Sequence, residues 1–150
     1  MSKRRVLLSK TRAPHFVYSV FKGMTMSSIL PTILIIENDP PTLELYRREL
    51  GRDFRVLACF SKSETLDAID SQSPKAIILE PAALDEEGWD LLNAIATLPD
   101  RSLPVILCTI LDERKRGLQA GAAAHLTKPV LPSALIEALH KVIKKTESAR

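Results

Sequence analysis

Polar side chains stand at the ends of four apolar runs in this chain of 150 residues. Glu37 and Asn38 follow the first of these runs, Glu80 follows another, Thr109 ends a third, and Lys128 follows the last. Carboxylates could hold a hard divalent cation, and a hydroxyl together with an ammonium could hold a phosphoryl oxygen. Taken singly, each residue is more often a helix cap or a solvent contact. The chemistry therefore requires a fold that brings them together.

The spacing of apolar residues predicts strands and helices that alternate from Pro31 onward. The expected strands are 32–36, 54–60, 76–79, 105–109 and 124–127. Nearly continuous runs of apolar, β-branched residues are typical of strands that a parallel sheet buries on both faces. The segments between them carry apolar residues at helical spacing, for example Leu43, Tyr46 and Leu50. Five strands alternating with five helices indicate an α/β fold with a doubly wound parallel sheet.

The predicted sheet gives the polar residues a common location. In an open α/β sheet, binding sites form outside the carboxyl ends of the strands, near the point where the strand order reverses. We therefore expect the four strand ends to share one edge of the sheet. No glycine-rich phosphate loop and no Ser-His-Asp arrangement accompanies them, which disfavours nucleotide binding and nucleophilic catalysis. The chain is not expected to be an enzyme.

Composition places the chain among ordinary globular proteins. Its residues are 45% apolar and 26% charged, and no run of eighteen apolar residues suggests a membrane span. The two cysteines, Cys59 and Cys108, each lie in an apolar stretch. Buried free thiols are therefore expected rather than a disulfide framework or a metal site. This favours a reducing, cytoplasmic location.

The net charge of +3 is unevenly distributed. Residues 1–28 hold six basic residues and no acid, which leaves 15 basic against 18 acidic residues in the rest. We expect 1–28 to be a basic, disordered tail, 29–146 to be the folded domain, and 147–150 to be a C-terminal tail. Three alternatives for 1–28 stay open. The segment could be an organelle transit peptide, since its composition also occurs in such peptides. It could result from a start codon of the chain that is assigned too early, or it could be a functional basic arm.

Four segments are similar to those of a known family. They are ILIIENDP at the first strand, PKAIILEP at the third, VILCT at the fourth and GAAAHLTKPV at the fifth. The chain from about Pro31 to Lys145 resembles the response-regulator receiver domain, a CheY-like family. The resemblance implies a flavodoxin-like, five-stranded parallel sheet with strand order 2-1-3-4-5. It also implies a role in two-component phosphorelay signalling.

The resemblance implies specific roles for residues at the sheet edge. In the family, acids after the first strand bind magnesium, and an aspartate ending the third strand accepts a phosphoryl group from a histidine kinase. A Ser or Thr and a Lys then contact that group. The matching positions are Glu37 and Asn38 for the acidic pocket, Glu80 for the acceptor, Thr109 and Lys128 for the phosphoryl contacts, His125 for the aromatic switch, and Glu37, Asn38 and Glu80 for the metal.

Three departures from the family pattern change the expected chemistry. Glu80 replaces the acceptor aspartate and moves the carboxylate outward by one methylene. Asn38 is neutral, so the cation site lacks one charge, while Asp39 is expected to cap the next helix. His125 replaces the usual Tyr or Phe. These departures indicate a pseudo-receiver that keeps the scaffold and has lost or weakened phosphoryl transfer, with no cofactor and at most weak Mg²⁺ binding.

The predicted function is a stand-alone atypical receiver module that acts through protein contacts. We expect Glu80 to pair with Lys128 and to bias the domain toward one signalling state. The expected partners are signalling proteins such as a histidine kinase or an output protein, rather than membranes or nucleic acid. One alternative is a working phospho-acceptor. Another is a DNA-binding regulator that uses the basic tail. We consider this alternative less favoured, because no helix-turn-helix segment is expected after the last helix.

Overall fold

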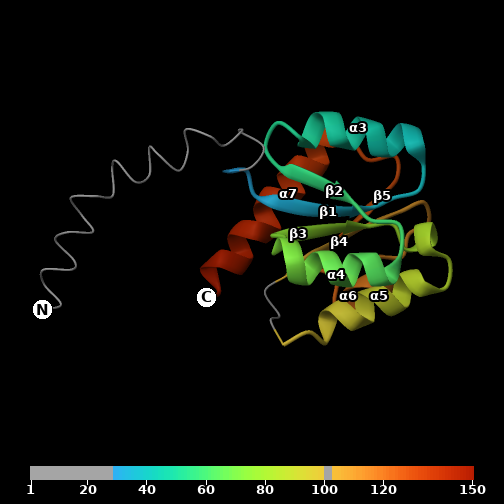
Figure 1. Cartoon of the computed structure of the whole chain (residues 1–150). Coiled ribbons are helices and arrows are strands. Elements are labelled where there is room, and N and C mark those ends of the chain that lie inside the picture. The colour runs from blue at the N-terminus through green and yellow to red at the C-terminus, as the bar shows by residue number, and fades with distance from the viewer. Residues whose placement is uncertain (1–28, 100–102) are drawn as a thin grey trace, which may run out of the picture. The chain divides into compact units, whose positions relative to one another are not determined.

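The computed structural model describes residues 29–99 and 103–150, and the domain treated below is the compact unit Pro31–Arg150 (Figure 1). Its five strands are β1 (Thr32–Ile36), β2 (Arg55–Ala58), β3 (Ala76–Leu79), β4 (Val105–Thr109) and β5 (Ala124–Thr127). All neighbouring pairs are parallel, in the order β2-β1-β3-β4-β5. The predicted fold class and strand order are confirmed.

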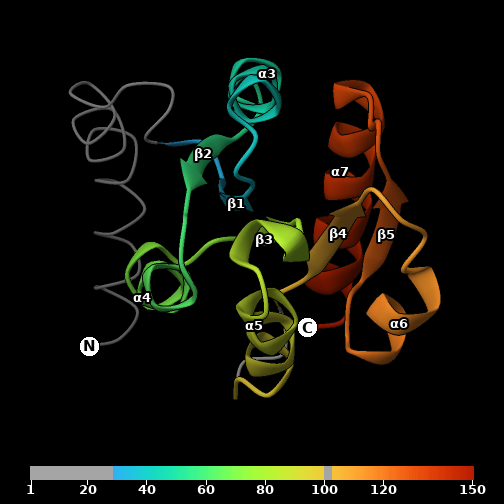
Figure 2. The same ribbon diagram turned by 90° about the vertical axis from the view of Figure 1, so that its right-hand side faces the viewer.

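In the described part of the domain, five α-helices cover the two faces of the sheet. They are α3 (Pro40–Leu50), α4 (Lys62–Gln72), α5 (Glu87–Ala96), α6 (Arg114–Gln119) and α7 (Pro132–Ser148), and a 3₁₀ turn, η1 (Pro81–Leu84), follows β3. Figure 2 shows α3 and α7 on one side of the strands and α4, α5 and α6 on the other. The longest of these helices, α7, has 17 residues. No helix among the described residues is long and apolar enough to cross a bilayer.

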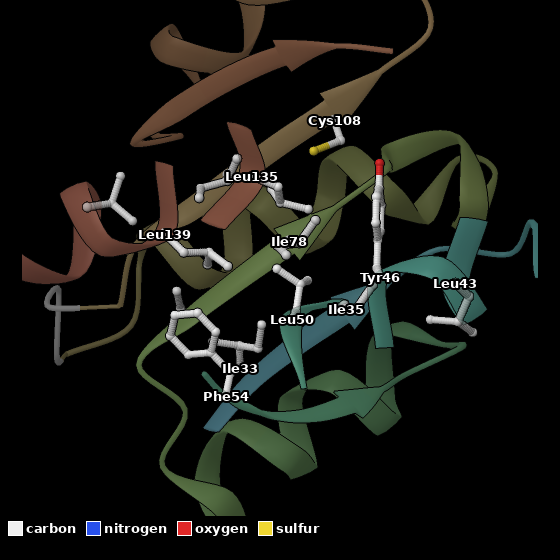
Figure 3. Close-up of a cluster of buried hydrophobic side chains, with 13 residues drawn as sticks. Ile33, Ile35, Leu43, Tyr46, Leu50, Phe54, Ile78, Cys108, Leu135 and Leu139 are labelled. Atoms are coloured by element: carbon white, nitrogen blue, oxygen red, sulfur yellow. The ribbon is translucent and has the colours of Figure 1, made fainter. Parts of the chain in front are cut away.

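The sheet separates two apolar cores. Alternate residues of a strand point to opposite faces, so Ile33 and Ile35 of β1 pack toward α3 and α7, whereas Leu34 and Ile36 pack toward α4 and α5. Figure 3 shows the first of these cores, in which Tyr46 and Leu139 belong to the two covering helices. Burial on both faces explains why β1 is apolar at every position but the first.

Both cysteines are free thiols and both are buried, as predicted from their apolar surroundings. Cys108 belongs to the core beneath α3 and α7, and Cys59 to the core on the opposite face. Burial raises the pKa of Cys108 to about 12 and also raises the pKa of Cys59. Both sulfurs are therefore protonated at neutral pH and behave as small apolar side chains.

Of the two tails predicted from the sequence, only the C-terminal one can be compared with the structure. The predicted tail of residues 1–28 lies outside the described residues. At the other end, α7 continues to Ser148, so two residues expected in a C-terminal tail are helical. The helix closes there through backbone bonds from Ala149 to the carbonyls of Lys145 and Thr146, which satisfy acceptors that the helix end would otherwise leave unpaired.

Candidate functional site

The carboxyl ends of the strands bring the predicted site residues to one edge of the sheet. Glu37 follows β1, Glu80 follows β3, Thr109 ends β4 and Lys128 follows β5. Parallel strands run in the same direction, so these ends meet at one edge. The exposed fractions of Glu37, Glu80 and Thr109 are only 3%, 6% and 4%. The side chain of Asn38, by contrast, is exposed.

Lys128 joins the two buried glutamates. Its Nζ donates a hydrogen bond to Glu37 Oε2 and lies 3.2 Å from Glu80 Oε2. The contact with Glu80 is an ion pair without hydrogen-bond alignment, because Oε2 is buried and has no hydrogen-bond partner among the described residues. The structure thus contains the expected contact between Glu80 and Lys128. It adds a closer contact with Glu37 that the sequence reasoning did not include.

The second oxygen of each glutamate accepts a hydrogen bond from the backbone of its own turn. Glu37 Oε1 accepts from the N–H of Asp39 at 2.9 Å. Glu80 Oε1 accepts from the N–H of Ala82 at 3.2 Å, as the N-cap of η1. Each carboxylate is therefore oriented by its own loop, and its remaining oxygen is directed to Lys128.

The electrostatics of the cluster keep Lys128 charged. Burial by itself lowers the pKa of Lys128, but the hydrogen bond and charge of Glu37 together with Glu80 outweigh it, and the pKa lies above its ordinary value. Opposite charges at short range favour the ionised form. One ammonium between two carboxylates leaves this cluster, which we call the Glu37–Lys128–Glu80 cluster, with a formal charge of −1.

Thr109 is bound on two sides. Its hydroxyl donates to the carbonyl of Leu111 and lies 2.7 Å from His125 Nε2. A hydroxyl has a single proton to donate, so it accepts from Nε2–H, which assigns the Nε2–H tautomer to His125. His125 Nδ1 is buried without a hydrogen-bond partner in the described part of the chain. The proton of Thr109 is thus directed to a loop carbonyl rather than toward Glu80.

A partly apolar groove lies beside the cluster. It encloses about 500 Å³ and is lined by Glu80 and Thr109 together with Trp89, Ile110 and Leu111, among others. Ile110 and Leu111 are 72% and 71% exposed, the highest values among the exposed large apolar residues described. The loop after β4 therefore presents apolar side chains next to the predicted acceptor position.

Asp39 caps the following helix, as predicted, instead of joining the acidic pocket. Its Oδ2 accepts from the backbone N–H of Thr42 at 3.1 Å and from the hydroxyl of the same residue. These hydrogen bonds lower the pKa of Asp39, because they favour the ionised carboxylate.

Asp39→Ala is expected to lower the midpoint of urea unfolding without changing the slope, because α3 loses its N-cap. The lowered pKa of Asp39 means that its contribution is present above the ordinary carboxyl pKa and is lost as the pH falls through the folded-state value. The difference in midpoint between wild type and variant should therefore shrink in acid. Asn38→Ala, a neighbouring exposed change, is the control. Equal midpoints for Asp39→Ala and wild type would contradict the capping role.

The residues implied for a metal do not assemble a suitable donor set. Among residues 29–99 and 103–150, no group of three His, Cys, Asp or Glu side chains is placed to hold a metal ion. Glu37 and Glu80 direct their free oxygens to the ammonium of Lys128, and Asn38 is exposed. Mg²⁺ requires octahedral oxygen ligands at short distance. The present arrangement of the described residues does not supply them.

Besides the contact between Lys128 and Glu37, two further contacts of the site were missed from the sequence. The carbonyl of Leu111 accepts the proton of Thr109, and the guanidinium of Arg114 donates to the carbonyl of His125 at 3.5 Å. Backbone acceptors leave no signal in residue types, so the sequence could not have indicated either contact. Two large apolar residues directly after a strand-ending threonine were a visible signal for the exposed loop.

Family and sequence comparisons agree with this architecture. A family model described as the response regulator receiver domain matches residues 33–140. A protein from Leptolyngbya boryana, described as an uncharacterized 14.6 kDa protein in the sodA1 3′ region, is 29% identical over 109 residues, which are 69% of this chain and 83% of that protein. Response regulator MprA of Mycobacterium avium is 29% identical over 119 residues, which are 77% of this chain and 52% of MprA. The chain thus spans about half of the length of MprA.

Solved structures show the same fold. A CheY-like response regulator receiver domain protein from Methanospirillum hungatei superposes with a TM-score of 0.72 at 26% sequence identity, covering 81% of this chain and 99% of that one. A structure described as a response regulator from Chloroflexus aurantiacus superposes with a TM-score of 0.70 at 25% identity, covering 77% and 98%. The superposed part is nearly the whole of each of the two solved chains.

Proposed function

Because this chain belongs to the response regulator receiver domain family, we propose that it is an atypical receiver module that signals through protein contacts without phosphorylation at Glu80. Receiver domains are signalling modules of two-component systems, in which they interact with histidine kinases and output domains. The proposed module acts in the cytoplasm, in keeping with its two free thiols. It binds a signalling protein and catalyses no turnover.

The observation that carries this proposal is the position of Lys128 between Glu37 and Glu80. A phospho-acceptor carboxylate needs an oxygen that can approach the phosphorus atom of the donor. Both oxygens of Glu80 are engaged, one by the N–H of Ala82 and one by the ammonium of Lys128. The extra methylene of glutamate supports the same conclusion, because it moves the carboxylate toward the region where phosphoryl oxygens would lie on a phosphorylated aspartate.

The hydrogen bonds around Thr109 support a single fixed arrangement of the edge. Thr109 and His125 are both buried and bond each other at 2.7 Å, and Arg114 at the start of α6 donates to the carbonyl of His125. Moving any one of them would break a hydrogen bond to another. We infer that the cluster, β5 and the start of α6 keep one arrangement, and that partners read the surface formed by α6, β5 and α7.

Incubation with a small phosphodonor and Mg²⁺, followed by intact-mass measurement, tests this proposal. The wild-type protein should gain no phosphoryl group, because Glu80 Oε1 accepts a hydrogen bond from Ala82 and Glu80 Oε2 is buried in an ion pair with Lys128. Glu80→Gln is the matched control, since it distinguishes this position from other acids. A phosphorylated species in the wild type that is absent from Glu80→Gln would refute the proposal and favour a working phospho-acceptor.

Restoring the family residues should restore the chemistry. The double variant Glu80→Asp with Asn38→Asp is expected to become phosphorylated under the same conditions, because it shortens the acceptor and returns an acid to the pocket. Each single variant serves as a comparison and should gain less phosphoryl group than the double variant. If the double variant stayed unmodified while folded, the two substitutions would not explain the lost chemistry.

A further inference from the structure

The groove between the turn after β3 and the loop after β4 has apolar walls and an acidic rim. We propose that this groove is a docking surface for a segment of a partner protein that combines large apolar side chains with lysines or arginines. It lies at the start of α5, on the face of the sheet that α4, α5 and α6 cover (Figure 2). It therefore differs from the surface of α6, β5 and α7 proposed above, and the inference does not rest on that surface.

The apolar walls come from separate parts of the chain. Ile110 and Leu111, in the loop after β4, are largely exposed and line the groove together with Trp89 of α5 and Pro81 of η1. Large apolar side chains in water are unfavourable, and contiguous ones mark interaction sites more often than isolated ones do. The volume of about 500 Å³ lies within the range that is typical of binding pockets.

A second groove extends this surface. It encloses about 480 Å³, and Asp85 lines both grooves. Its far end is Phe60, which directly precedes α4 and is 57% exposed. The two grooves together extend from Phe60 past η1 to Leu111. An elongated surface with exposed apolar side chains at both ends suits an extended or helical segment of a protein better than a compact small molecule.

The charge of the rim specifies the partner. Among the described residues, every charged side chain that lines the two grooves is acidic: Glu80, Asp85, Glu86, Glu87 and Glu113. The three that lie at the start of α5 are exposed and form no ion pair within the described part of the chain. The guanidinium of Arg116, which lies over the Trp89 ring, is already paired with Glu113. This rim attracts lysines and arginines and repels acidic segments and nucleic acid.

The experiment titrates the full chain with the amidated peptide LKKLLKKLLKKL, which presents leucines on one face of a helix and lysines on the other. Calorimetry gives the Kd. Trp89 is the single tryptophan of the chain, so its emission reports binding in the groove, and it should shift to shorter wavelength as the peptide excludes water from the ring. The matched peptides LEELLEELLEEL and GKKGGKKGGKKG should bind at least about tenfold more weakly, because one lacks the positive charge and the other the apolar side chains.

An apolar variant assigns the binding to the groove. Ile110→Ser combined with Leu111→Ser should raise the Kd of LKKLLKKLLKKL by about tenfold, because two apolar contacts are lost. Both side chains are exposed, so the variant should keep the Tm of wild type. Leu131→Ser is the matched control, since Leu131 is 70% exposed but does not line either groove. It should leave the Kd unchanged.

A charge variant tests the acidic rim. Asp85→Asn combined with Glu86→Gln should raise the Kd by about threefold at low salt and by less at high salt, because exposed charges are screened. Asparagine suits position 85, where φ is 51°. Glu137→Gln, on an exposed position of α7, should leave the Kd unchanged at either salt concentration.

Four results would overturn the inference. Wild type that does not bind LKKLLKKLLKKL would do so, as would an equal Kd for wild type and the Ile110→Ser, Leu111→Ser variant. Binding of LEELLEELLEEL as tight as that of LKKLLKKLLKKL would contradict the role of charge. Self-association of wild type that the same double variant abolishes, measured by sedimentation, would make a second copy the occupant instead. No phosphodonor is present, so these outcomes are independent of whether Glu80 is phosphorylated.

Discussion

Replacing Lys128 by methionine should lower the free energy of unfolding by about 3 kcal/mol, because it leaves two buried carboxylates without a counter-charge. Glu37 and Glu80 are almost fully buried, and Lys128 contacts both. Urea unfolding followed by circular dichroism measures the change. Lys141→Met, on an exposed position of α7, should change the unfolding free energy by less than about 0.5 kcal/mol.

The pH dependence of the free energy of unfolding, measured for wild type and Lys128→Met, gives a second check. The pKa of Lys128 is raised above its ordinary value of 10.5 in the folded state. Its stabilising contribution is therefore complete below that ordinary pKa and is lost as the pH rises through the folded-state value. The pKa of Tyr46 is raised to about 12, mainly by burial, so both proteins also lose stability through Tyr46 as the pH rises above its ordinary pKa. The difference in free energy of unfolding between wild type and Lys128→Met should therefore become smaller at alkaline pH. A difference that stays constant would contradict the role assigned to Lys128.

Gly88→Ala should destabilise the domain by about 3 kcal/mol, because a Cβ at this position would lie 2.0 Å from the carbonyl oxygen of Pro81. The obstacle is backbone, so no side-chain rotation relieves it. Pro81 directly follows Glu80, and the displaced turn would include the N–H of Ala82 that holds the Glu80 carboxylate. Urea unfolding measures the loss of stability.

Asp90→Ala on the same helix is the control for the glycine variant, since Asp90 is exposed. It should remain within about 0.5 kcal/mol of wild type. If Gly88→Ala were equally mild, the close approach of α5 to the turn after β3 would not be required for the fold. The packing of α5 against the turn at Pro81 thus also affects the candidate site, because the same turn holds the Glu80 carboxylate.

Local pattern alone was sufficient to predict the elements of the fold. The strands β1, β3 and β4 begin and end where the apolar runs do, because only side chains that are apolar at nearly every position can fill both faces of the sheet. The edge strand β5 also has the predicted bounds, although only His125 of its four residues is buried. The second strand is shorter than predicted, Arg55–Ala58 instead of 54–60. It lies at the edge of the sheet, where burial is incomplete and the pattern marks the ends of a strand less sharply.

The sequence by itself determined which residues gather at the edge, because strand ends in a parallel sheet share one side. It did not determine which of them touch. Lys128 bonds Glu37 across 91 positions of the chain, and no local pattern encodes a contact of that separation. The proton of Thr109 goes to a backbone carbonyl, which residue types do not reveal. Tertiary structure decided both contacts, because the strand order and the loop after each strand set the distances between side chains that local propensity leaves free.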